Sequence, residues 1–290
     1  MYFSRKYAVL KLATDAKRRN VGRNLKKNEP KMSLKRSIWK NHFKKNEIPE
    51  WNCPTCKKGI LKGDEKNFII SEDSETIKNY SWEDWEEFFR KGVFCGTLKC
   101  NNSNCDENVA IIGEMSVIEE SFYAEEVDDV IETYTELLKP KLFIPSLEIF
   151  TLIESIPENI KYQIKEAFSL FFTDNSSCAN KIRIVVELIM DEFKIQKVTI
   201  GNDRKRRKIS LHHRIEKFKL KYPYEGEFLM AIKWIGNTGS HSVEQLTKDD
   251  TLDGFEMLEH VIYKLYEIET KKINLLKKKI NERKGAIKKR

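Results

Sequence analysis

Four cysteines, arranged as two close pairs far apart in the chain, constrain this sequence more than any other feature. The first pair, Cys53 and Cys56, is followed by a basic turn that contains Gly59, and the second pair is Cys100 and Cys105. Two such turns on strand hairpins bring four thiolates around one point, which is the arrangement that tetrahedral zinc prefers. The sequence therefore predicts a structural zinc site, in which Gly59 permits the chain reversal because glycine adopts positive φ without steric cost.

Two further cysteines leave an alternative open. Cys95 precedes Cys100 by the same spacing that separates Cys100 from Cys105, so Cys95 competes with Cys105 as a ligand. We favour Cys105, because the Asn-Asn-Ser-Asn insert before it is typical of a turn, whereas residues 94–98 have the pattern of a strand. Cys178 is expected to be a small buried residue. A thioredoxin-like redox pair would need a βαβ pattern around Cys53, and this pattern is absent.

Charge is distributed unevenly along the chain. Residues 1–46 carry a net charge of +13 and residues 271–290 carry +9, whereas the interval between them carries −14. Basic ends on an acidic body indicate contact with RNA or DNA, and the alternative is that both ends are simply solvated. No apolar run approaches the ~20 residues of a membrane span, so a cytoplasmic protein with no membrane contact is expected. Met32 offers a second plausible start of the chain.

Hydrophobic patterning predicts an α+β protein in which a small zinc-ribbon-like module precedes an all-α helical bundle. The expected segments are a basic extension over 1–46, the zinc-ribbon-like module with a helical insertion over 47–120, a helix and linker over 121–156, the bundle over 157–270, and a basic tail over 271–290.

Three segments carry more specific expectations. Ser81–Phe89 has one aromatic stripe behind a capping serine and predicts the inserted helix. Tyr123–Leu138 also reads as a helix, and Pro140–Pro145 reads as an extended linker that forms the domain boundary. A basic loop between two bundle helices is the predicted nucleic-acid-binding element, and its residues are Arg204, Lys205, Arg206, Arg207 and Lys208.

The bundle contains one distinctive stretch, Ala231–His241. Its apolar helical run ends in Gly-Asn-Thr-Gly-Ser, so the pattern predicts that the helix stops at Gly236 and that a new helix follows. The junction would bring together the ammonium of Lys233, the amide of Asn237 and the imidazole of His241. The residues alone leave open whether this junction is catalytic or is a structural corner.

The helical half resembles the domain-of-unknown-function 4145 family of bacteria, and the resemblance covers roughly residues 32–266. A zinc-knuckle front end with a tryptophan before Cys-Pro-Thr-Cys, as at Trp51, also occurs in such proteins. The segments that carry the resemblance are Ser177–Leu188, Leu211–Ile215, Ala231–His241 and Asp253–Glu259.

That family is in turn similar to the HEPN (higher eukaryote and prokaryote nucleotide-binding) helical bundles. Many of these are metal-independent ribonucleases of toxin or phage-defence systems, which often act as dimers. Their motif has an arginine, commonly followed by asparagine, and then a histidine, so the resemblance implies a proton-transfer role for His241 beside Asn237. Gly236 stands where the arginine would be, and Lys233 lies outside the usual spacing.

We therefore expect a bacterial binding module that contacts nucleic acid or a partner protein, with a homodimer through the helical bundle as one form. One alternative is a metal-independent endoribonuclease in which His241 is the general acid and base and Lys233 and Asn237 lie around the phosphate. A second alternative is a purely structural assembly subunit.

Overall fold

The computed structural model describes residues 34–40, 42–124, 128–201, 204–241 and 246–285, apart from the side chains of 124, 239–241 and 268–272. The chain divides into a unit over residues 1–33, which lies outside this description, and a unit over residues 34–290. Within the described part, no helix is both long and apolar enough to cross a membrane.

The segment that follows Ser33 does not belong to a basic extension, so the boundary predicted at residue 46 is wrong. Trp39, in the short helix α2 (Ser37–Lys40), and Phe43 are both buried. The guanidinium of Arg36 lies 2.5 Å from the carboxylate of Asp253 and 2.7 Å from that of Glu256. The apolar positions of this segment therefore decide its structure, and its lysines and arginines remain at the surface.

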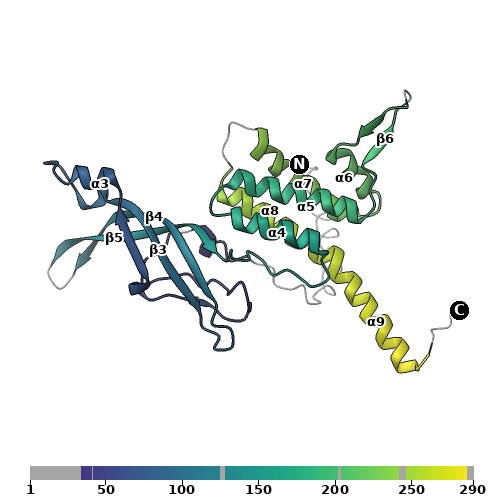
Figure 1. Cartoon of the computed structure of the whole chain (residues 1–290), viewed down its shortest axis with the longest axis horizontal. Helices are drawn as coiled ribbons and strands as arrows, with labels where there is room; N and C mark the ends of the chain where they lie inside the picture. Colours follow the sequence, from purple (N-terminus) through teal and green to yellow (C-terminus); the bar gives the residue numbers. More distant parts are fainter. Residues whose placement is uncertain (1–33, 41, 125–127, 202–203, 242–245, 286–290) are drawn as a thin grey trace, which may run out of the picture. The chain divides into compact units, whose positions relative to one another are not determined.

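An antiparallel sheet is built around β3 (Lys91–Cys100), as Figure 1 shows. One edge of β3 pairs with β1 (Leu61–Lys62) at its C-terminal end and with β2 (Phe68–Glu72) nearer its N-terminal end. The other edge of β3 pairs with β4 (Asn108–Ala124). The outer strand β5 (Asp129–Ile144) pairs with β4 along nearly its whole length. The prediction of a mixed α and β protein is confirmed in this coarse form.

The strand β5 overturns two predictions. The helix expected over Tyr123–Leu138 and the linker expected over Pro140–Pro145 are instead the end of β4, a connection, and one continuous strand. The segment 130–135 is rich in β-branched and aromatic residues, which favour a strand once a partner strand is present. Pro140 is accepted because it lies on an edge strand, next to the register shift at Ile112 and Gly113.

The inserted segment between β2 and β3 also differs from expectation. Ser81–Phe89 forms turns and one 3₁₀ helix (η2, Glu87–Phe89), and the helix of this insertion lies earlier, at α3 (Ser74–Asn79). The side chain of Asp73 accepts a hydrogen bond from the amide of Thr76, and this N-cap fixes the start of α3. Trp82 remains 58% exposed, so the aromatic stripe does not form a helix face that packs on a core.

The helices in the second half of the chain have recognisable starts. Pro157 precedes α4 (Glu158–Leu170), and Ser210 caps α6 (Leu211–Lys219) by accepting from the amide of His213. The helices α4, α5 (Asn175–Glu192), α7 (Pro223–His241) and α8 (Lys248–Ile262) pack on one another. A π-helical turn (Tyr263–Glu267) leads from α8 into α9 (Ile268–Arg283).

This half is not all helical. The basic loop is part of a β-hairpin in which β6 (Val198–Ile200) pairs with β7 (Arg206–Lys208). The β-branched run Val-Thr-Ile favours an extended strand, and the basic residues opposite it complete the ladder. The hairpin projects from the region between α5 and α6 in Figure 1.

The helix junction predicted at Gly236 is wrong, because α7 continues through to His241. No described glycine has positive φ. A Cβ atom at Gly236 would lie 2.6 Å from the Cβ of Arg183 on α5. Gly236 therefore allows close packing of two helices and does not form a turn.

Gly236 and Gly254 should respond in opposite directions to substitution by alanine. Gly254→Ala is expected to stabilise by about 0.4–1 kcal/mol, because a Cβ there meets Ile182 at an ordinary 3.5 Å and no other described residue, and because alanine restricts the unfolded chain. Gly236→Ala is expected to destabilise by about 1–3 kcal/mol through overpacking against Arg183. Urea unfolding of both variants checks this, and a stabilised Gly236→Ala would contradict the close-packing role.

Candidate functional site

The structure brings together the two cysteine pairs that the sequence nominates. The Sγ atoms of Cys53, Cys56, Cys100 and Cys105 all lie within 4.8 Å of one another. The Sγ atoms of Cys53 and Cys105 are 3.7 Å apart, and those of Cys56 and Cys100 are 3.6 Å apart. Four sulfurs at about 2.3 Å from a tetrahedral ion would be about 3.8 Å from one another, so this spacing fits one metal ion.

Two similar turns position these sulfurs. In the first turn, the amide of Lys57 donates to the carbonyl of Cys53 at 3.0 Å, and Lys57 has a φ of 58°. In the second turn, Asp106 has a φ of 50° and directly follows Cys105. The residue after the second cysteine of each pair is therefore left-handed, and this conformation reverses the chain.

Gly59 has a different role from the one predicted, because the reversal is made by Lys57. A Cβ atom at position 59 would lie 2.3 Å from the Sγ of Cys100, so only glycine leaves room for this sulfur. The amide of Gly59 also points at Cys56, and its nitrogen is 3.3 Å from that Sγ. In the second turn, the amide of Asn102 donates to the Sγ of Cys100, and its nitrogen is 3.4 Å from that sulfur.

The thiols have strongly divergent acidities. The amides of Gly59 and Lys58 lower the pKa of Cys56 to about 6, because they stabilise its thiolate. Burial raises the pKa of Cys100 to about 12. Cysteine binds a metal ion as the thiolate, so a metal ion held by all four sulfurs would also favour loss of the proton from Cys100.

The strand register explains why Cys95 is outside this cluster. Side chains alternate between the two faces of a strand, so Phe94, Leu98 and Cys100 share the inward face of β3 while Cys95 points outward and is exposed. Cys178 is buried in α5 as expected, and its thiol donates to the carbonyl of Ala167 at 3.1 Å.

The β6–β7 hairpin presents the predicted basic residues at the surface. Arg204, at the turn, and the four residues that follow it are all exposed. In the register of the hairpin, Arg206 stands opposite Ile200 and Lys208 stands opposite Val198, so these four side chains share one face. Ile200 is 69% exposed. This face therefore combines cations with accessible apolar surface.

Of the three residues predicted at the junction in α7, the side chains of Lys233 and Asn237 belong to the described part of the chain. Lys233 is 5% exposed, its Nζ lies 2.9 Å from the ring centroid of Trp234, and burial lowers its pKa. Asn237 is half-buried one turn further along the helix. The side chain of His241 lies outside the described residues, so its relation to the other two is not defined.

Arg183 is a residue of this region that the sequence did not single out. Its stem contacts the place where a side chain at Gly236 would be, and its Nη1 lies 3.4 Å from the carboxylate of Glu187. Its Nε is buried and has no hydrogen-bond partner in the part of the chain that the structure describes. No local motif marks such an arginine, because the glycine that its stem contacts comes from another helix.

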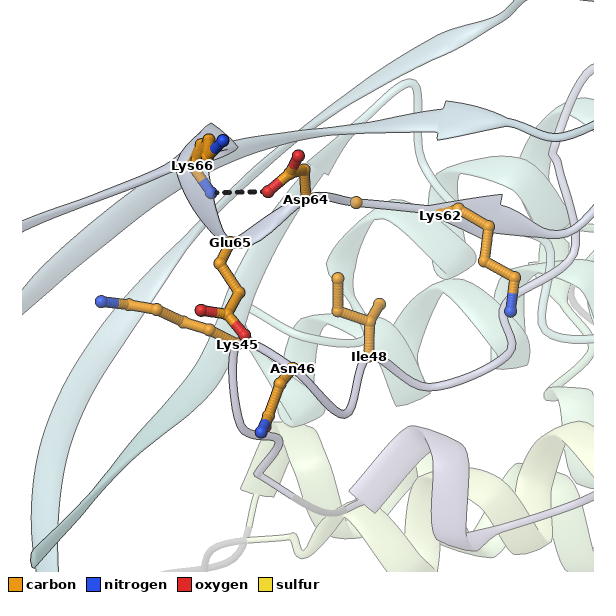
Figure 2. A pocket seen from close by; sticks show the side chains of 8 residues that line it. Lys45, Asn46, Ile48, Lys62, Asp64, Glu65 and Lys66 are labelled. Atoms are coloured by element: carbon orange, nitrogen blue, oxygen red, sulfur yellow. Dashed lines mark hydrogen bonds between the residues drawn. The ribbon is translucent and has the colours of Figure 1, made fainter.

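A hollow of about 550 Å³ lies on the sheet part and is shown in Figure 2. Its wall mixes Lys45, Lys62 and Lys66 with Asp64 and Glu65, so positive and negative charges largely compensate. The Lys45 ammonium is paired with Glu136 at 2.8 Å. Among the described residues, this hollow therefore has no cluster of like charges that would select a charged ligand.

Fold and site together define a protein that joins a sheet, whose four clustered cysteines could hold a metal ion, to a set of packed helices with a basic hairpin. Residues 41–143 match the model of a domain of unknown function (DUF8608), and residues 165–283 match that of another (DUF4145). The resemblance inferred for the helical half is thus confirmed over residues 165–283. No curated protein and no solved structure matches the chain.

Proposed function

We propose that the four cysteines hold one structural zinc ion and that the sheet part is a zinc-ribbon-like module. An all-cysteine set is typical of structural zinc, because four thiolates leave no position for a reacting water. The paired turns and the amide–sulfur contacts of Gly59 and Asn102 support this assignment. The second part would then be a HEPN-like helical bundle interrupted by the basic hairpin.

The function that the geometry supports best is binding of single-stranded nucleic acid through the β6–β7 hairpin. The observation that carries this proposal is the face on which Arg206 and Lys208 lie beside Val198 and Ile200. Cations contact phosphates, and exposed apolar side chains offer a surface for sugars and bases. The residues of both strands of the hairpin are exposed, so a flexible strand can approach it.

The test is binding of a labelled single-stranded RNA to the full chain at several salt concentrations. The double variant Arg204→Gln/Arg206→Gln is expected to weaken binding about tenfold and to reduce the salt slope by about 1.4, because two phosphate contacts to a single strand are lost. Fluorescence anisotropy measures both quantities.

A matched control is Lys62→Gln/Lys66→Gln, which removes two exposed cations from the hollow in Figure 2 and should leave binding unchanged. Equal weakening by the two double variants would mean that binding follows overall charge and does not depend on the hairpin. Absence of salt-dependent binding by the unmodified chain would exclude the proposal.

A second candidate function is metal-independent RNA cleavage with His241 as general acid and base. The contact of Arg183 with Gly236 favours it, because α5 then supplies a guanidinium next to the α7 stretch that contains Lys233 and Asn237. The same RNA, read on a denaturing gel, decides the matter. Cleavage that persists in EDTA and disappears in His241→Ala supports this candidate, and equal cleavage by the variant excludes it.

A further inference from the structure

A pocket of about 330 Å³ lies where α5, the end of β7 and the start of α6 meet. Its polar lining consists of Arg183 and Glu187 from α5, Lys208 from β7, and Ser210 and Arg214 at the start of α6. This volume is at the small end of the range for ligand sites. It suits a compact polar group better than a large apolar molecule.

Two guanidinium N–H groups of the lining have no acceptor among the described residues. They are the Nε atoms of Arg183 and Arg214, which are both buried. Arg214 is held from its other end, where Nη2 donates to Asp191 at 2.6 Å and to the carbonyl of Ile195 at 2.9 Å. A buried donor without an acceptor is costly, so an oxygen-rich ligand would stabilise both arginines.

The start of α6 adds a further positive contribution. The hydroxyl of Ser210 already accepts from the amide of His213, and the first turn of α6 contains no acidic residue. The partial positive charge of this helix end is therefore not balanced by a carboxylate on its own helix. Backbone amides at such a position bind anionic oxygens.

The charged side chains around the pocket have a net charge of about +2. Among the described residues, the lining carries three cations and one carboxylate, which is Glu187. Asp191, which pairs with Arg214, does not change this net charge, because its carboxylate also pairs with the ammonium of Lys197 at 2.6 Å. We propose that this pocket binds a phosphate monoester group, whose two negative charges match this excess. A phosphodiester inside a strand carries one charge and is flanked on both sides by chain, so it fits less well.

The source of the monoester is either a strand end or a small molecule. Lys208 belongs both to the pocket and to the hairpin, so in its strand-end form the inference rests on the proposed nucleic-acid binding. Three probes separate these cases: AMP, a short RNA with a 5′-phosphate, and the same RNA with a 5′-hydroxyl. All three are titrated into the full chain by isothermal calorimetry.

The expected result is that AMP competes with the 5′-phosphorylated RNA and that this RNA binds at least about tenfold more tightly than its 5′-hydroxyl form. Arg183→Gln should remove the preference, and Lys208→Gln should reduce it. Binding of AMP should weaken as the pH falls below about 6, where the monoester loses its second charge. A melting curve of each variant verifies that it is folded.

Lys217→Gln is the matched control, because Lys217 is an exposed cation on α6 outside the pocket lining. Equal binding of both RNAs together with no binding of AMP would overturn the inference, as would a preference that survives Arg183→Gln. Arg183-dependent binding of AMP without any RNA binding would support the pocket while excluding the hairpin function. RNA binding that depends on Arg206 but is the same for both 5′ ends, with no binding of AMP, would support the hairpin function while excluding the phosphate pocket.

Discussion

Cys100→Ser is expected to abolish metal binding and to lower the free energy of unfolding by more than about 4 kcal/mol. Structural zinc contributes about 10–16 kcal/mol to small zinc-binding peptides, so the loss of one ligand removes a large part of the stability of the sheet. Cys100 also ends β3 opposite Leu61, which is fully buried, so the damage extends into the core. Thermal melting and the zinc content of the purified chain measure the effect.

Cys95→Ser is the matched control for this experiment. Cys95 lies on the same strand but on its exposed face, so its replacement should change stability by no more than about 0.5 kcal/mol and leave the zinc content unaltered. A strong chelator should lower the melting temperature of the unmodified chain toward that of Cys100→Ser. One zinc per chain in Cys100→Ser, with normal melting, would show that Cys100 is not a ligand.

The cysteine cluster could be predicted from sequence because each half of it is local. Cys53 and Cys56 share one turn, and Cys100 and Cys105 share another, so only the meeting of the two turns required the fold. Choosing Cys105 over Cys95 depended on recognising a strand before Cys100, because alternation along that strand places Cys95 on the other face. The roles of Lys57 and Gly59 could not be separated, since the steric demand on Gly59 comes from Cys100, a residue distant in sequence.

The errors in the fold have a common cause, which is a partner distant in sequence. The segment 123–138 contains glutamates and apolar residues that suit either a helix or a strand, and pairing with β4 decides between them. The glycines in Ala231–His241 are typical of a helix end, yet Gly236 is required by the stem of Arg183. Local propensity carries no information on such contacts, so the pocket beside Arg183 was also beyond sequence reasoning.

Trp51→Ala is the second change for which we expect a large effect, a destabilisation of about 3–5 kcal/mol. Trp51 is fully buried, and its ring lies edge-on to those of Phe43 at 5.5 Å and Phe143 at 5.0 Å. Its Nε1 donates to the carbonyl of Ile38 at 3.0 Å, and its own carbonyl accepts from the amide of Leu61 at 2.8 Å. The cavity would thus open between α2, the first cysteine turn and β5.

Two companion variants separate the contributions of this side chain. Trp51→Phe keeps an aromatic ring but leaves the Ile38 carbonyl without its donor, so a smaller loss of about 1–3 kcal/mol is expected. Trp82→Ala removes a tryptophan that is 58% exposed and should be nearly neutral. Chemical unfolding followed by circular dichroism compares the three.

Because Trp51 lies two residues before Cys53, Trp51→Ala should also weaken metal binding. If it retained full zinc affinity while losing stability, the cysteine cluster would be independent of the aromatic core beside it.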